Sequence, residues 1–436
     1  MTTNRLRQVA SFLLLVVALA VAVPGASSTA ASGISPSAQF TQAQMLLEGG
    51  PSTQIAALEA QGNFHDAALI RALAAVPRGF WLVGGQPEDV EAYVAEIMAQ
   101  ASATSSVPIL VAYNIPGRDC AQYSAGGATN SLAYAAWVDA VARGIGNGQV
   151  VVILEPDSLG LLPSGCGGPN VNYPFTDADR YAELIDALDT FTALPAASVY
   201  LDGTQSAWLS VGDVALRLAT AHVERAQGFF LNVSNFQSNQ NLITYGTWIS
   251  KCLAFAKNPA DGGWRLGHYE LCASQYWPAN ANDFSSWALS DAWYDTNLGA
   301  VTATAHFVID SGRNGRGPWT APANHPAGDP QEWCNPPGRG TGIATTAVTD
   351  VPLLDAYLWI KPPGESDGGC FRWTGGPHDP VRNMADPAAG SWFDTMALEL
   401  ATNAQPNLEP LLSSIASAGG STIPSFVGST IPSFTG

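Results

Sequence analysis

The chain has 436 residues, of which 47% are hydrophobic and only 12% are charged, with frequent glycine (43) and proline (30). This composition excludes a disordered chain and predicts a globular protein that is rich in loops. The formal net charge of −18 argues against nucleic acid as a partner, because an acidic surface repels a phosphate backbone.

Residues 1–32 are expected to be a secretory signal peptide. Arg5 and Arg7 precede an apolar run at 11–23, and small residues follow it. The run is short for a membrane span, so an uncleaved anchor is the less favoured interpretation. We therefore expect a secreted, extracellular protein that is not membrane-bound once the signal is removed. Residues 33–40 are expected to form a connector.

Seven short apolar runs are predicted to be buried parallel strands, because each is nearly continuously hydrophobic. They lie at residues 79–83, 108–113, 150–154, 198–201, 228–233, 306–309 and 356–360. Apolar residues at helical spacing separate several of them, at 89–100, 131–145 and 177–193. This alternation predicts an α/β fold with a parallel sheet, most simply a β/α barrel that falls short of the usual eight strands.

One domain is predicted over residues 41–410, followed by a low-complexity tail at 411–436. The tail is rich in Ser, Gly, Ala and Thr, and it repeats the sequence STIPSF at 421–426 and 429–434. Such a segment buries too little apolar surface to fold alone, and it is typical of a linker.

Disulfides are expected, because an exported chain with an even number of cysteines usually pairs them. The six cysteines are Cys120, Cys166, Cys252, Cys272, Cys334 and Cys370. Sequence alone permits fifteen connectivities, of which pairing between sequence neighbours is the simplest. Neither the cysteines nor the six histidines show metal-ligand spacing, so we expect no metal and no other cofactor.

Carboxylates follow four of the predicted strands, and they are expected to meet where the carboxyl ends of barrel strands converge. They are Asp119, Asp157, Asp202 and Asp367. Crowded carboxylates raise one another's pKa. Glycoside hydrolysis uses this effect, because one carboxyl group must protonate the leaving oxygen while another stays ionised. Tryptophans near the same strand ends offer flat apolar faces for sugar rings, namely Trp81, Trp208 and Trp333.

Each of these features also has a structural explanation. An aspartate after a strand is about as often a helix N-cap as a catalytic group. Arg118 and Asp119 are compatible with a structural ion pair, and most of the 13 tryptophans are expected in the core. It is the combination of four carboxylates at strand ends that favours a hydrolase.

The segments that carry these residues resemble those of glycoside hydrolase family 6, the inverting cellulases. In chain order they read AYNIPGRDC, VVILEPDSLG, YLDGTQSAWL, GFFLNVSNF, FVIDSGRNG, EWCNPPGRGTG and DAYLWIKPPGESDGGC. The resemblance implies a distorted seven-stranded parallel barrel in a single catalytic domain, with β-1,4-glucan as the substrate and partner.

The resemblance also assigns catalytic roles. Asp157 matches the general acid, Asp119 the aspartate that raises the pKa of that acid, and Asp367 the debated base. Asp202 matches an aspartate that supports the site. Tyr113 matches the tyrosine at the cleaved sugar ring, and Ser124 lies close to where a relay would hold its water.

Further residues are predicted from the same resemblance or from their place at a strand end. The predicted substrate-binding residues are Trp81, Trp208, Asn232, Trp333, Lys361 and Glu365. The pairs Cys120–Cys166 and Cys334–Cys370 match the family's two disulfides, which favours neighbour pairing and leaves Cys252 with Cys272.

The chain departs from the family pattern at two places. Gln205 replaces a histidine of the family's DAGH motif, which puts a substrate contact in doubt. The segment 247–298 is longer than the family's commonest form and is expected to cover one end of the cleft.

An endo-acting enzyme is predicted, because a long loop that roofs the cleft of processive members is absent here. Only Gly368 and Gly369 separate Asp367 from Cys370. The alternatives are an exo-acting cellobiohydrolase, a hydrolase for another β-glucan, and a glucan-binding protein without catalysis. The last is disfavoured because all four carboxylates are present. A monomer is the default for a secreted enzyme that acts on a polymer.

Overall fold

The computed structural model describes residues 33–41, 50–166, 174–322, 331–372, 374, 376–408 and 410. The predicted signal peptide and the C-terminal tail lie outside these described residues. From residue 33 onward, the described chain belongs to one compact unit. None of its helices is both long enough and apolar enough to span a bilayer.

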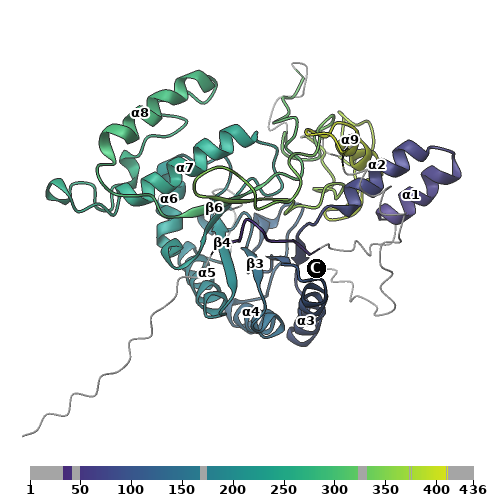
Figure 1. The fold of residues 1–436 in the computed structure, drawn as a ribbon, viewed down its shortest axis with the longest axis horizontal. Helices are drawn as coiled ribbons and strands as arrows, with labels where there is room; N and C mark the ends of the chain where they lie inside the picture. The colour runs from purple at the N-terminus through teal and green to yellow at the C-terminus, as the bar shows by residue number, and fades with distance from the viewer. Residues whose placement is uncertain are drawn as a thin grey trace, which may run out of the picture. The chain divides into compact units, whose positions relative to one another are not determined.

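Seven parallel strands form one sheet whose spatial order is their order in the chain (Figure 1). Their bounds are β1 Phe80–Leu82, β2 Ile109–Ala112, β3 Val150–Leu154, β4 Ala197–Asp202, β5 Gly228–Leu231, β6 His306–Asp310 and β7 Leu354–Leu358. All seven predicted strands are confirmed, and the ends differ from the prediction by a few residues at most. The predicted seven-stranded parallel arrangement is therefore confirmed as well.

The two edge strands approach each other without forming a ladder. The N–H of Gly79 donates to the carbonyl of Trp359, just beyond β7, at 2.9 Å. The indole of Trp81 donates to the carbonyl of Ile360 at 2.9 Å. A Cβ atom on Gly79 would lie only 2.6 Å from that Ile360 oxygen, so this approach requires glycine. The sheet thus curls into an almost closed barrel. In the described part of the chain β1 and β7 are not paired, and a single backbone hydrogen bond joins the residues beside them.

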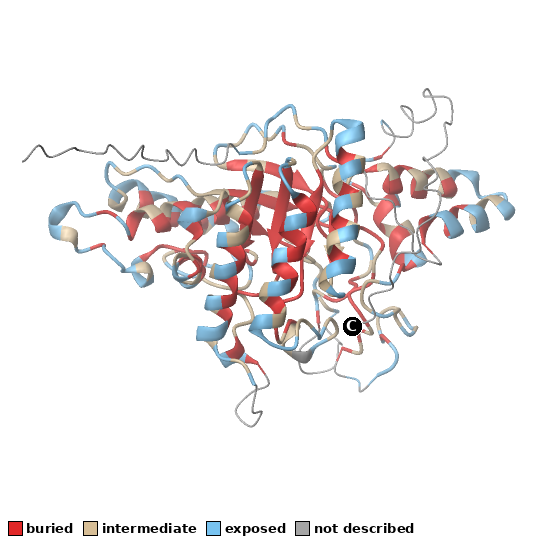
Figure 2. Ribbon diagram, turned by 90° about the horizontal axis from the view of Figure 1, so that it is seen from below, coloured by how far each residue is buried: buried red, intermediate tan, exposed pale blue. Residues whose placement is uncertain are grey.

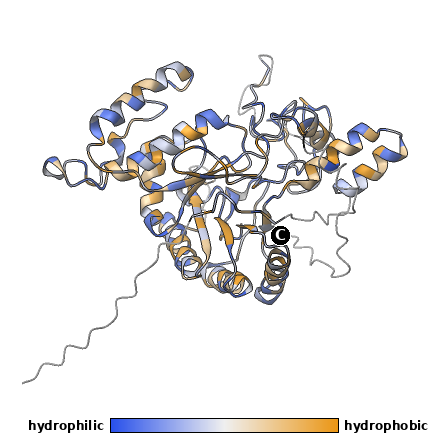
Figure 3. Ribbon diagram, in the orientation of Figure 1, coloured by the Kyte–Doolittle hydropathy of each residue, from blue (hydrophilic) through white to orange (hydrophobic). Residues whose placement is uncertain are grey.

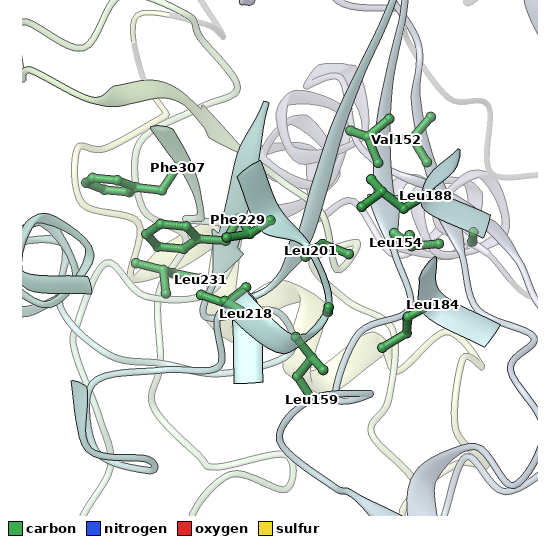
Figure 4. Close-up of a cluster of buried hydrophobic side chains, with 14 of the residues drawn as sticks. Val152, Leu154, Leu159, Leu184, Leu188, Leu201, Leu218, Phe229, Leu231 and Phe307 are labelled. Carbon is green, nitrogen blue, oxygen red and sulfur yellow. The ribbon is translucent and has the colours of Figure 1, made fainter. Parts of the chain in front are cut away.

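Alternate residues of each strand belong to two separate apolar clusters, as the period of two predicts. Val151 and Ile153 of β3 belong to the cluster that fills the barrel, whereas Val152 and Leu154 pack outward under the helices. Figure 4 shows part of the outer cluster, where strand and helix side chains meet. Figures 2 and 3 show the buried, hydrophobic sheet and the helices whose inner faces cover it.

Nine helices are present in the described part of the chain. Their bounds are α1 Pro51–Ala60, α2 Phe64–Ala75, α3 Pro87–Thr104, α4 Ser131–Ile145, α5 Asp177–Thr192, α6 Val211–Thr220, α7 Asn239–Phe255, α8 Ala288–Asn297 and α9 Asp394–Thr402. The three predicted helices are confirmed as α3, α4 and α5. Each has a start signal, such as Pro87 at the first turn of α3 and the Thr176–Asp179 capping box of α5.

The other six helices were not predicted. In α6 the apolar spacing is clear, with Val211, Val214, Ala215 and Leu218 buried on one face, so the sequence prediction missed a readable helix. In α8 only Ser290 and Tyr294 are buried, so almost no apolar face is readable. Helices α1, α2 and α9 instead share a second cluster around Trp392 and Leu73, formed by segments more than 300 residues apart. Long-range packing of this kind leaves little trace in a local pattern.

The three predicted disulfides are confirmed, since Cys120–Cys166, Cys252–Cys272 and Cys334–Cys370 are all bonded. The first joins the loops after β2 and β3, and the third joins the loops after β6 and β7. Both therefore fix segments that carry predicted site residues. The second lies within the segment 247–298, where it ties α7 to the loop that follows it.

Candidate active site

The loop after β3 is held in place by a buried carboxylate at its start. Glu155 has a left-handed φ of 53° and is fully buried. It accepts hydrogen bonds from the backbone N–H groups of Asn114 and Ile115, at 2.9 and 3.0 Å. Burial raises the pKa of Glu155 to about 7, and these two hydrogen bonds lower it in part. The carboxylate thus pins the loop after β2 to the loop after β3.

Asp202, the last residue of β4, holds the same loop from the other side. One carboxylate oxygen accepts the backbone N–H groups of Leu159 and Gly160, at 3.1 and 3.0 Å. The other accepts the N–H of Thr204 at 2.8 Å. Because only 2% of Asp202 is exposed, it positions the loop and does not face a substrate. Burial raises its pKa, and the three N–H groups oppose that rise.

Asp157 lies between these two anchors. It has a left-handed φ of 65° and is half-buried. Within the described residues its carboxyl group has no hydrogen-bond or ion-pair partner. Burial raises the pKa of Asp157 well above its usual range, and the negative charges of Asp202, Asp119 and Asp367 raise it further. Asp157 therefore keeps its proton at a pH where an ordinary aspartate loses it.

Asp119 lies in the short 3₁₀ turn after β2, and the structure brings it close to Asp157. Its carboxylate accepts the N–H of Ser124 at 2.7 Å. Burial raises the pKa of Asp119 to about 6, while this bond and the charge of Arg118 lower it. The guanidinium of Arg118 donates to the carbonyls of Tyr113 and Ser124, at 2.5 and 2.8 Å. Arg118 therefore shapes the loop, and in the described structure no direct ion pair joins it to Asp119.

Asp367 has the opposite environment to Asp157. Its carboxylate forms a buried ion pair with Arg313 at 2.9 Å and accepts the backbone N–H of Asn335 at 3.0 Å. Asn335 returns a contact by accepting the N–H of Asp367 at 2.8 Å. Hydrogen bonds of this kind to a guanidinium and an amide fix the orientation of a carboxylate. Among the described residues, the site thus contains one carboxyl group without a partner, Asp157, and one held by an ion pair and a backbone N–H group, Asp367.

Four aromatic and charged side chains lie together where the edge strands β1 and β7 approach each other. The rings of Trp81 and Tyr113 meet edge to face, with centroids 5.2 Å apart. The ammonium of Lys361 lies 5.6 Å from the Trp81 ring and 3.9 Å from the carboxylate of Glu365. Burial raises the pKa of Tyr113, and Asp157 and Asp119 raise it further. Tyr113 is therefore a neutral hydroxyl beside the two aspartates.

The other two predicted tryptophans each rest on a neighbouring loop and are half-buried. Trp208 packs on Gly160, where a Cβ atom would lie 2.4 Å from the ring. Trp333 contacts the ring of Tyr123, with centroids 6.0 Å apart. Both rings are therefore fixed relative to the aspartates, and each keeps some accessible surface.

The prediction that Asn232 binds substrate is wrong. Asn232 is fully buried, and its amide nitrogen donates to the carbonyl of Asp310 at 2.9 Å. Its amide oxygen accepts the N–H of Gln237 at 2.9 Å. The nitrogen thus links the loop after β5 to the end of β6, and the oxygen holds the loop after β5 in its conformation.

Sequence reasoning gave no role to three residues that the structure places in the site. Glu155 and Arg313 belong to the motifs EPDSLG and IDSGRNG. Both are charged residues just beyond a strand end, and this position could have identified them as site residues. Asn335 had no such signal, because it contacts Asp367 only through the fold. Gln205, at the departure from the family pattern, accepts the N–H of Ala207 at 2.6 Å, which is a local turn contact.

One group of possible metal ligands occurs among the described residues, at Cys370, Asp379 and Asp386. The sulfur of Cys370 is in a disulfide, and Asp379 is paired with Arg372 at 2.8 Å. The sulfur of Cys370 and the carboxylate of Asp379 are therefore already bonded to other residues, so the group does not offer a metal site.

Four buried or half-buried carboxyl groups predict that the protein is more stable in mild acid than at neutral pH. Burial raises the pKa to about 6 for Asp119, Asp310 and Asp386, and to about 7 for Glu155. A raised folded-state pKa gives stability that is full below the unfolded pKa and is lost as the pH rises through the folded pKa. The melting temperature should therefore fall between about pH 4 and about pH 7.

Two measurements isolate this cause from repulsion between surface charges. High salt screens the surface of this acidic chain but not its buried groups, so the fall should persist in salt. A Glu155→Gln variant, which does not ionise, should show a shallower fall above about pH 6. A melting temperature that rises over this range would contradict the prediction.

Comparisons with known proteins match most of the chain. The model of the glycosyl hydrolases family 6 matches residues 43–404. Endoglucanase A of Cellulomonas fimi is 35% identical over 341 residues, which is 78% of this chain and 57% of that protein. A probable 1,4-β-D-glucan cellobiohydrolase C of Neosartorya fischeri is 29% identical, over 77% of this chain and 71% of that protein. The chain thus spans little more than half the length of the first relative.

Among solved structures, the chain is similar to the endoglucanase Cel6 from Mycobacterium tuberculosis in complex with methyl-cellobiosyl-4-deoxy-4-thio-β-D-cellobioside. The TM-score is 0.60 and the identity 31%, covering 84% of this chain and 98% of that one.

Proposed function

Because this chain belongs to the glycosyl hydrolases family 6, we propose that it hydrolyses β-1,4-glucan with inversion, using Asp157 as the general acid. The single observation that carries the proposal is the environment of Asp157. Its carboxyl group is half-buried, has no partner in the described structure, and lies near three other carboxylates. A general acid must hold its proton until the leaving oxygen takes it, and this environment supplies that condition.

Asp367, whose carboxylate is held by Arg313, is the first candidate for the base that activates water. In an inverting enzyme the water attacks the opposite face of the sugar ring in a single displacement. A route through a water near Ser124 to Asp119 is the second candidate, since the N–H of Ser124 already orients that carboxylate. In both routes Asp202 acts through the loop that carries Asp157, which makes it a positioning residue.

The substrate is proposed to be bound by the aromatic and charged side chains around these aspartates. Trp208 and Trp333 offer partly accessible rings of the kind that stack on sugar faces. Lys361 and Glu365 form a close charged pair that offers both a donor and an acceptor to hydroxyl groups. Tyr113 lies within reach of the charge of Asp157, which is consistent with a place beside the cleaved ring.

Internal cleavage is favoured over exo action, with cellobiohydrolase as the second candidate. Only two glycines separate Asp367 from Cys370, and Cys370 is tied to Cys334, so this loop is too short to roof the site. Secretion is supported by the three disulfides, which persist in an oxidising environment. A monomer is proposed as the working form.

The protein should lower the viscosity of soluble carboxymethyl cellulose early, while few reducing ends have been released. Internal cuts shorten a polymer quickly, whereas exo action removes small units and leaves its length almost unchanged. Proton NMR of a cellohexaose digest should show the α-anomer as the first product, because a single displacement inverts the β-linkage. Reducing sugar without viscosity loss would establish exo action instead. Prompt release of the β-anomer would exclude inversion.

A further inference from the structure

The inserted segment 247–298 places two exposed aromatic residues next to Trp208. Tyr276 is 44% exposed and Trp277 is 58% exposed, and both lie in a turn between α7 and α8. The hydroxyl of Tyr276 donates to the main-chain carbonyl of Trp208 at 3.0 Å. The turn is thus in direct contact with the loop that holds a proposed sugar-binding tryptophan.

The turn is held in one conformation by hydrogen bonds to Ser274. Its hydroxyl accepts the N–H groups of Tyr276 and Trp277, at 3.1 and 3.3 Å. Its own N–H donates to the carbonyl of Trp277 at 2.6 Å. Ser290 of α8 donates to the carbonyl of Ser274 at 2.7 Å. These hydrogen bonds fix the backbone that carries the two exposed rings, which reduces the conformational entropy lost when a ligand binds.

The same turn is also bonded to the loop after β4, which carries Trp208. Gln275 is fully buried, and its amide donates to the carbonyls of Ser206 and Leu209, at 3.0 and 2.9 Å. These residues flank Trp208 in the chain. The Cys252–Cys272 disulfide fixes the entry to the turn. Trp208 and the turn are consequently one connected surface.

We propose that Tyr276 and Trp277 form an additional glucan-binding subsite, which takes the part of the chain that extends beyond Trp208. Exposed tryptophan and tyrosine rings are apolar faces with a polar edge, which suits a pyranose with its C–H face and its hydroxyl rim. A polymer bound at Trp208 continues past it, so the adjoining surface meets the next sugar residues. This subsite rests on the proposed function, because it assumes a glucan at Trp208.

Binding measured in the Asp157→Asn background tests the subsite without hydrolysis. Calorimetry should show that Trp277→Ala weakens cellohexaose binding about tenfold, the effect of losing one stacked ring. Binding of the short cellotriose should not change. Trp264→Ala is the matched control, since Trp264 is also exposed on the insertion but its ring already carries the Arg265 guanidinium at 4.4 Å. It should leave both affinities unchanged.

Each other outcome overturns the subsite in a distinguishable way. An unchanged cellohexaose affinity in Trp277→Ala overturns it alone and leaves the proposed function standing. An equal loss for both sugars shows that the change disturbs Trp208 and adds no subsite. If the parent binds neither sugar, the proposed function fails at Trp208 and the subsite fails with it. Sedimentation that shows self-association lost in the variant, with sugar binding intact, would assign the turn to an interface between copies.

Discussion

An Asp157→Asn variant should fold as the parent does and lose about 10²- to 10⁴-fold of its turnover on cellulose, the usual contribution of a general acid. The amide cannot supply a proton to the leaving oxygen. Folding should survive because no described residue bonds to the carboxyl group of Asp157, which is already driven towards its neutral form. Turnover on carboxymethyl cellulose and the circular dichroism spectrum are the two measurements.

A substrate that needs no proton separates loss of the acid from general damage. A dinitrophenyl β-cellobioside has a leaving group that departs as a stable anion, so the variant should retain most of the parent's rate on it. Asp186→Asn is the matched control, because Asp186 is exposed on α5. That variant should match the parent on both substrates. An Asp157→Asn protein that remains active on cellulose would remove the assignment of the acid.

The sheet was predictable because each strand is buried on both faces and therefore reads as a continuous apolar run. The carboxylates at the strand ends were predictable for a related reason, since parallel strands bring their carboxyl ends to one side. The sequence did not reveal which of these carboxylates are accessible to a substrate and which are bonded inside the protein. Asp202 ends β4 and Asp157 follows β3, but only the carboxylate of Asp202 accepts three backbone N–H groups.

Residues that act through the fold were also missed or misassigned. Asn232 stands at a strand end like the true site residues, and only its contacts with Asp310 and Gln237 show that it is internal. Asn335 supports Asp367 from 32 residues away, a pairing that no local pattern encodes. The exposed turn at Tyr276 and Trp277 lies in the segment 247–298, which was predicted to be longer than the family's commonest form. Its link to Trp208 became visible only through the bond between them.

Arg372→Met should destabilise the protein by about 3–5 kcal/mol, because it leaves the buried carboxylate of Asp379 without its cation. Arg372 and Asp379 are both completely buried. The guanidinium donates to the two carboxylate oxygens at 2.9 and 2.8 Å, and to the carbonyls of Gln331 and Cys334 at 2.8 and 2.7 Å. Denaturant unfolding with the disulfides intact measures the loss.

A second change at the same pair tests whether the unpaired charge is the cause. The Arg372→Met, Asp379→Leu double variant should recover much of the lost stability, because an apolar pair of similar size has no charge to desolvate. The exposed pair of Arg143 and Glu91, at 2.8 Å, is the control. Arg143→Gln should cost less than about 1 kcal/mol. A double variant no more stable than Arg372→Met would show that the carbonyl contacts carry the stability instead.

The same pair also links stability to the proposed chemistry. Arg372 holds the segment that begins at Gln331, and that segment carries Trp333 and then Asn335, whose N–H donates to Asp367. Loss of Arg372 should therefore lower turnover even at a temperature where the variant is fully folded, because the orientation of Asp367 depends on this segment. Arg143→Gln should leave turnover unchanged. If Arg372→Met unfolds more easily but retains full turnover while folded, the segment is held by its disulfide and Asp367 alone, and the ion pair is purely structural.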